Sequence, residues 1–163
     1  MTLRHTLMRH GFQALLRLFA WVARRPRLSW LAQTMGEGMA HVVGRTRRLG
    51  QAHDVAHLGR LWQRAFPSAK HVPIESVTHT TVIAQIHTHC PLRGSGDVHA
   101  CHRMMAFDRA LVEGAGGQFI VIASQATPGV SHCRVALRMA GQPVDDLVPA
   151  HLNPDTRHTE THP

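Results

Sequence analysis

Three cysteines, Cys90, Cys101 and Cys133, are the residues of this 163-residue chain whose type and spacing could do chemistry. They follow the pattern Cys-x10-Cys-x31-Cys, and histidines and an aspartate accompany them. A free cysteine is often a small buried hydrophobe, so burial in the core is one reading of this set. The histidines and the aspartate near the cysteines favour a second interpretation, in which the thiols belong to a reactive or metal-binding site.

A cysteine nucleophile needs a base within hydrogen-bond reach, and often a third group that orients the base. Either Cys90 or Cys101 qualifies as the nucleophile, and Asp108 as the orienting acid. An aspartate on a core-facing helical stripe is costly unless it is paired, so Asp108 is expected to have a role. The bases near the thiols are histidines, with the strand residues preferred: His87 and His89 before Cys90, and His99 and His102 on the following helix.

A metal site is the alternative chemistry. Three thiolates and one imidazole make a complete tetrahedral zinc set, and they also suit an iron–sulfur cluster. The ligands would be Cys90, Cys101, Cys133 and His89. The chain has no CxxC pair, however, so the spacing is a weak indication of zinc or iron–sulfur binding.

These side chains meet only if the elements that carry them form one unit. Hydrophobic periodicity predicts strands over 77–87, 118–125 and 130–139, with the last two paired as a hairpin. A helix is predicted from Ser95 or Asp97 to Glu113, ending at the glycines that follow. The result is a β-α-β-β unit.

Side-chain parity then places each cysteine on an apolar face. Alternation along a strand puts Cys90 on the side of Ile86, provided the chain does not bend at His87, and puts Cys133 on the side of Val135. Helical spacing puts Cys101 on one stripe with Asp108. We therefore expect the three thiols at one helix–sheet interface.

The N-terminal third carries the whole charge excess. Residues 1–50 hold nine arginines and one acid, whereas residues 51–163 are balanced, and the net charge of the chain is +8. Amphipathic helices are predicted over 2–23 and 29–43, and a third over 54–66. A charge block of this kind indicates an anionic membrane surface or an acidic protein partner bound through residues 1–48, or arginines that simply face water. No helix-turn-helix or zinc-finger spacing supports nucleic acid, which we do not expect as a partner.

The predicted organisation is therefore an α+β fold with three parts. Residues 1–50 form a basic helical segment, residues 51–149 an α/β domain with the Cys/His site, and residues 150–163 a disordered tail. The apolar stretch 12–23 is too short to span a membrane and contains Arg17. An odd number of cysteines without a secretory signal favours a reducing cytoplasm, and the basic helices allow peripheral membrane attachment.

Three short motifs resemble the L-2-amino-thiazoline-4-carboxylate hydrolase-like family: Cys90-Pro91-Leu92, the helix 107–114 with Asp108, and the late strand 131–135 with Cys133. They span about fifty residues, roughly a third of the chain. The resemblance implies hydrolysis of a small heterocyclic or amide-like substrate by a thiol. The arrangement is also similar to the 4-vinyl reductase domain, which implies a small-ligand or metal-binding module instead.

The chain departs from the hydrolase-like pattern at two positions. Met105 stands where the family's helix cysteine is expected, and Cys101 lies one turn earlier on the same face. Val135 replaces a usual aromatic residue. We expect Cys101 to replace the missing thiol.

Overall fold

A computed structural model describes residues 2–153 of the chain, without the side chains of residues 2–10, 12 and 13. Within that range the protein is α+β, with five α-helices and one four-stranded antiparallel sheet. The strand order is β1-β2-β4-β3. The strands are β1 (Ile74–Val77), β2 (Val82–Ile86), β3 (Gly117–Ala123) and β4 (Cys133–Met139).

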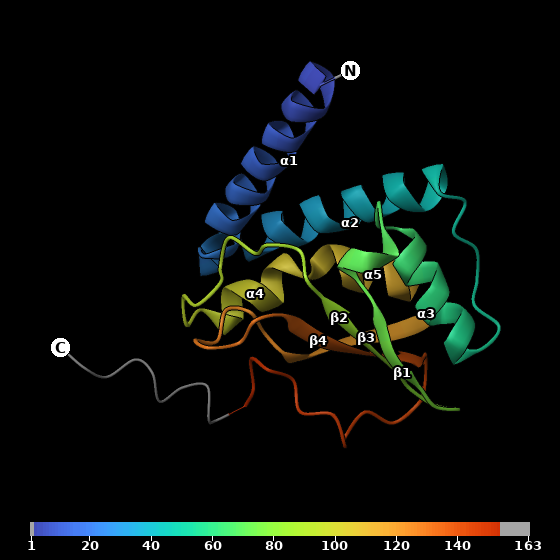
Figure 1. Cartoon of the computed structure of the whole chain (residues 1–163). Helices are drawn as coiled ribbons and strands as arrows, with labels where there is room; N and C mark the ends of the chain where they lie inside the picture. Colours follow the sequence, from blue (N-terminus) through green and yellow to red (C-terminus); the bar gives the residue numbers. More distant parts are fainter. Residues whose placement is uncertain (1, 154–163) are drawn as a thin grey trace.

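The helices lie in layers on one face of this sheet (Figure 1). α3 (Val55–Arg64) packs on β2 and β4, α5 (Ala106–Gly114) packs on β3, and α2 (Ser29–Thr46) crosses over α5. α1 (Thr2–Ala23) contacts α2 and α4 (Val98–Met104), and its N-terminal part projects away from the domain (Figure 1). The predicted basic helices therefore pack as an outer layer over the α/β unit.

The sheet was predicted incompletely. The strand expected over 77–87 is shorter, since β2 begins at Val82 and follows a turn in which the Thr78 backbone N–H donates to the Thr81 carbonyl. β1, which precedes this turn and pairs with β2, was not predicted. The predicted hairpin is confirmed, since β3 pairs with β4 in antiparallel register. β4 also pairs with β2, from Val82 opposite Leu137 to Ile86 opposite Cys133. The late strand therefore lies at the centre of the sheet.

The predicted helix that ends at Glu113 is also two helices. Asp97 caps α4 by accepting a hydrogen bond from the Ala100 backbone N–H at 2.7 Å. The chain then breaks at Met105, which lies between α4 and α5. Cys101, Met105 and Asp108 are nevertheless all buried.

The opposite face of the sheet is covered partly by the segment after β4. Arg138 is buried on that face, where its Nε donates to Thr81 Oγ1 at 2.8 Å and its Nη2 pairs with Asp146 at 2.5 Å. The Ala150 backbone N–H donates to the Val121 carbonyl at 2.8 Å. Residues 150–153 of the predicted tail therefore form a turn that is hydrogen-bonded to the domain through Ala150. The rest of that tail lies outside the described residues.

Candidate functional site

A cavity of about 660 Å³ lies beneath the N-terminal helices and contains all three thiols. Asp108 and His89 also line it, and most of the remaining wall is apolar. α1 contributes Leu16 and Phe19, so the basic segment closes over the site. Further apolar wall residues come from α2, from the residues after α3 and from α4–α5: Met39, Val43, Ala65, Phe66, Met104, Met105 and Phe107. The polar wall residues include His71, a histidine that was not identified from the sequence.

Cys101 and Cys133 both line the cavity, and each thiol changes the pKa of the other. The hydrogen bond to Cys133, followed by burial, raises the pKa of the Cys101 thiol well above its ordinary value. The same hydrogen bond lowers the pKa of Cys133 against the opposing effect of burial. The Gln125 backbone N–H also donates to Cys133 Sγ, at 3.2 Å. Cys101 therefore holds its proton, and Cys133 is the more acidic of the two thiols.

Cys90 lies in the loop after β2. Because β2 ends at Ile86, the strand alternation used to place Cys90 does not reach it, but the residue is buried in the same cavity. Its sulfur accepts a hydrogen bond from the Leu92 backbone N–H at 3.4 Å. Burial raises the pKa of this thiol, which makes it the weaker candidate for a nucleophile.

Gln125 holds this loop in place and was not identified from the sequence. Its Nε2 donates to the Ile86 and Thr88 carbonyls, each at 3.0 Å. Its Oε1 accepts from Arg93 Nε and Nη2 at 3.0 and 2.7 Å. The side chain is almost fully buried, and one residue thereby connects the end of β3 to the loop that carries Cys90. No short motif marks such a role, because all of its partners are distant in sequence.

Asp108 is buried as predicted, but its partner is not a histidine. The indole Nε1–H of Trp62 donates to Asp108 Oδ1 at 3.0 Å. Burial raises the pKa of the Asp108 carboxyl to about 6, although the Trp62 hydrogen bond and the Arg109 charge act in the opposite direction. Within the described part of the chain, the predicted Cys–His–Asp relay is therefore not assembled around Asp108. This carboxyl can instead exchange a proton directly near neutral pH.

The four histidines predicted as bases lie in three different places. His89 is exposed and borders the cavity. His87 lies outside it, with Nε2 2.7 Å from Gln85 Oε1 and its ring stacked on His132 at 4.8 Å between centroids. His102 lies beside the ring of His151, at 3.8 Å between centroids, and His99 approaches the same ring. Of the four predicted bases, His89 is the one that the fold brings to the cavity.

His102 has an unusual environment of its own. Burial, with the nearby charges of Arg109 and His151, lowers the pKa of His102 to about 4. His151 was expected to be a solvated tail residue, but its ring is partly buried against α4. This histidine group anchors the segment after the sheet and belongs to a different surface from the thiols.

The predicted metal ligands are not arranged around a common point in the described part of the chain. Across residues 2–153, no three or more His, Cys, Asp or Glu residues are grouped so that they could hold a metal ion. Cys90, Cys101, Cys133 and His89 share the cavity wall without forming such a group. Zinc or iron–sulfur binding by these four residues stays a prediction.

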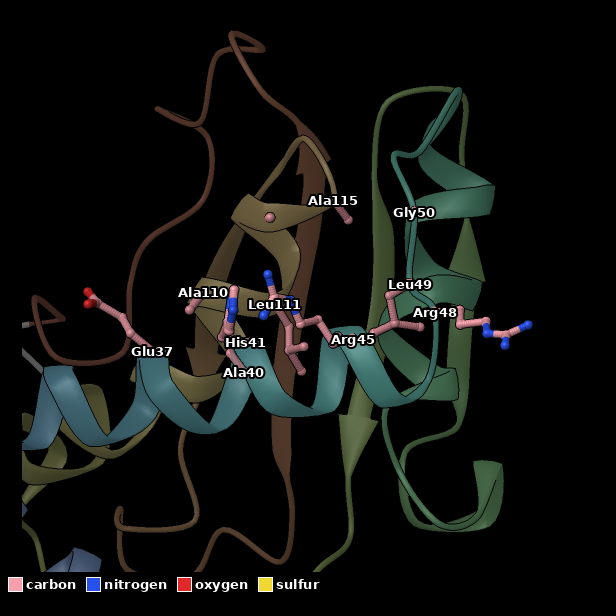
Figure 2. A pocket seen from close by; sticks show the side chains of 12 residues that line it. Glu37, Ala40, His41, Arg45, Arg48, Leu49, Gly50, Ala110, Leu111 and Ala115 are labelled. Atoms are coloured by element: carbon pink, nitrogen blue, oxygen red, sulfur yellow. The ribbon is translucent and has the colours of Figure 1, made fainter.

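A second hollow, of about 410 Å³, lies between α2 and the C-terminal end of α5 (Figure 2). His41 and Arg45 point from α2 toward α5, whereas Arg48 points away (Figure 2). The carbonyl of Gly114 at the end of α5 accepts a hydrogen bond from Gln51 Nε2 at 2.8 Å. None of the predicted site residues lines this hollow.

Comparison of the chain with known protein families, with curated proteins and with solved structures finds no significant match. The fold and the site therefore define the class of this protein by its architecture. It is an α+β protein with a largely apolar cavity, three buried thiols and one buried carboxyl. No helix among the described residues is long and apolar enough to cross a membrane.

Proposed function

We propose that this protein is a small-molecule hydrolase that uses a cavity thiol on a small heterocyclic or amide-like substrate, in the manner of a thiazoline carboxylate hydrolase. The observation that carries the proposal is the presence of the Cys101 and Cys133 thiols and the Asp108 carboxyl in the wall of one cavity. A volume of about 660 Å³ suits a small organic molecule. The free thiols fit a reducing compartment such as the cytoplasm.

The nucleophile of this proposal is Cys133, rather than Cys90 or Cys101. Cys133 gives its proton to the carboxylate of Asp108, and its sulfur forms a bond to the electrophilic C=N or C=O carbon of the substrate. Asp108 then returns the proton to the heteroatom that leaves as the substrate bond breaks. Water attacks the resulting thioester or thioimidate, the sulfur–carbon bond breaks, and Cys133 recovers a proton.

The test is turnover of L-2-amino-thiazoline-4-carboxylate and of small amides by the full chain. We expect Cys133→Ser to lower kcat by about a thousandfold or more, because the nucleophile is lost. Cys101→Ala should shift the pH profile of kcat/KM, since the Cys133 thiol loses the neighbouring sulfhydryl that lowers its pKa. Mass spectrometry of a stalled reaction should place the substrate adduct on Cys133.

His87→Gln is the matched control for His89→Gln. The two histidines are close in sequence, but only His89 borders the cavity. Substitution at His87 should leave kcat/KM unchanged, whereas substitution at His89 should raise KM. Full activity of Cys133→Ser, or an adduct on Cys90 alone, would refute the role of Cys133.

A non-enzymatic ligand-binding module is the second candidate. It is favoured by the raised pKa of Cys90 and Cys101, which keeps both thiols protonated near neutral pH, and by the apolar wall. In that case small apolar molecules should raise the Tm of the parent and of Cys133→Ser equally, without turnover. Elemental analysis of protein purified without oxygen, beside a Cys90/Cys101/Cys133 triple-serine variant, tests the metal-binding form of this candidate.

A further inference from the structure

We propose that the elbow between α1 and α2 is a docking surface for an anionic lipid bilayer. The elbow consists of the C-terminal half of α1, the short 3₁₀ turn Pro26–Leu28 and the start of α2. This interaction surface is separate from the thiol chemistry, and the proposal stands whether or not the cavity is catalytic.

The outer face of α1 is apolar and exposed. Leu18 and Trp21 are three residues apart, which places them next to each other on one side of the helix. Their exposed fractions are 53% and 52%, and Trp30 at the start of α2 is 64% exposed. Large apolar side chains gathered in this way on a surface indicate an interaction site.

The other side of the same helix fixes the elbow to the domain. Phe19 and Val22 are 3% exposed and pack with Ala32 of α2. Arg103 of α4 donates from Nε to the Ala23 carbonyl at the end of α1. The outward face is therefore presented by a packed helix and does not depend on a loop.

Arginines surround this apolar face. Arg17, Arg24 and Arg27 are exposed on the elbow, and the guanidinium of Arg25 lies 3.5 Å from the ring centroid of Trp21. One acid, Glu37, stands among the nine arginines of residues 1–50. A second copy of this surface would bring like charges together, whereas an anionic bilayer offers opposite charge and an apolar layer below it. Tryptophan and arginine are side chains suited to that interface.

The experiment is co-sedimentation of the full chain with phosphatidylcholine vesicles that contain or lack phosphatidylglycerol. We expect binding to the anionic vesicles that weakens with salt, and little binding to pure phosphatidylcholine. Tryptophan emission should shift to the blue on binding. Since Trp62 is only 2% exposed, that shift reports on Trp21 and Trp30.

Two double variants separate the apolar and charged contributions. Leu18→Ser/Trp21→Ser should lower the partition coefficient by about tenfold or more, because two inserted side chains are lost. Arg24→Glu/Arg27→Glu should lower it by more than about 25-fold, since each basic residue near an anionic surface contributes about fivefold. Arg60→Glu/Arg64→Glu on α3 makes the same change in net charge away from the elbow, and should leave binding close to that of the parent.

Three outcomes would overturn the proposal. They are equal binding of Leu18→Ser/Trp21→Ser and the parent, an equal loss in the α3 control, and a lipid-independent dimer in sedimentation equilibrium that Leu18→Ser/Trp21→Ser dissolves. The last result would assign the face to a second copy of the chain. Cys133→Ser should bind vesicles as the parent does, so failure of the hydrolase proposal is distinguishable from failure of this one.

Discussion

At the scale of single residues, Asp108 shows how a polar group is kept in an apolar wall. Its carboxyl is 7% exposed and takes one hydrogen bond from the Trp62 indole. One neutral donor compensates a carboxylate only partly for the loss of water, which is why the pKa rises to about 6. The residue thus lowers the stability of the protein while its charge is present.

Asp108→Asn should therefore change how stability depends on pH. The native pKa of about 6 lies above the value of 3.8 expected for an unfolded chain, so ionised Asp108 destabilises the fold above pH 6. That cost disappears as the pH falls through 6 toward 4, when the native carboxyl takes up a proton. Relative to the parent, the Asn variant should gain about 2 kcal/mol at pH 8 compared with pH 4.

Urea unfolding of both proteins at the two pH values measures this gain. Asparagine keeps an oxygen acceptor for the Trp62 indole, so the contact is preserved. Asp145→Asn, which changes an exposed carboxyl, is the control and should follow the parent at both pH values. A difference between Asp108→Asn and the parent that does not vary with pH would contradict the assignment.

At the scale of elements, the packing of α2 on α5 determines the shape of the cavity wall that these two helices form. The two helices approach most closely at Gly36, where an added Cβ would lie 2.7 Å from both Ala106 Cβ and Phe107 N. Phe107 also lines the thiol cavity. A glycine in the middle of a helix is unfavourable in itself, so the close packing is the physical reason for its presence here.

Gly36→Ala should destabilise the protein by about 1–3 kcal/mol, because the methyl group forces α2 away from α5. Gly38→Ala is the matched control two residues along the same helix, where nothing lies within 4 Å of the added Cβ. It should stabilise the protein by about 0.5–1 kcal/mol through helix propensity. Thermal unfolding of both variants gives the comparison, and a stabilising Gly36→Ala would contradict the packing described here.

At the scale of the whole molecule, the cavity depends on segments that are far apart in the chain. α1 closes it from above, β4 supplies Cys133 from the centre of the sheet, and the loop after β2 supplies Cys90. Gln125 connects the loop after β2 to β4, because its side chain bonds to Ile86, Thr88 and Arg93 and its backbone N–H donates to Cys133 Sγ. The site is thus stable only when the sheet and its loops are assembled together.

Gln125→Ala should lower the free energy of unfolding by about 2–4 kcal/mol, because two buried carbonyls and one guanidinium lose their partner. Alkylation of Cys90 by iodoacetamide should also become faster, since its loop is released. Gln118→Ala is the control, because its Nε2 also donates to two backbone carbonyls, those of Met139 and Gln142, but at a less buried position where water can replace it. Equal effects of the two substitutions would show that the Gln125 network does not hold the loop.

Local periodicity was enough to predict much of the fold. Helix α1 and the β3–β4 hairpin were predicted closely, because apolar spacing and turn residues act within a few positions of the chain. The alternation that groups Cys133 with Val135, and the helical stripe of Cys101 and Asp108, correctly predicted that these side chains face the interior. Composition likewise located the arginine excess in the N-terminal helices.

Contacts between distant segments determined everything else. The Trp62–Asp108 hydrogen bond joins residues 46 positions apart, and the Gln125–Ile86 bond joins residues 39 positions apart. The sequence by itself thus determined which side chains face inward, because burial follows local spacing. Side-chain parity also predicted that the three thiols would gather at one interface, whereas the tertiary structure alone placed Trp62 beside Asp108 in place of a histidine and His87 outside the cavity. The reason is physical, since hydrogen-bond partners and pKa values depend on the order in which strands and helices pack, and that order is not encoded in any short segment.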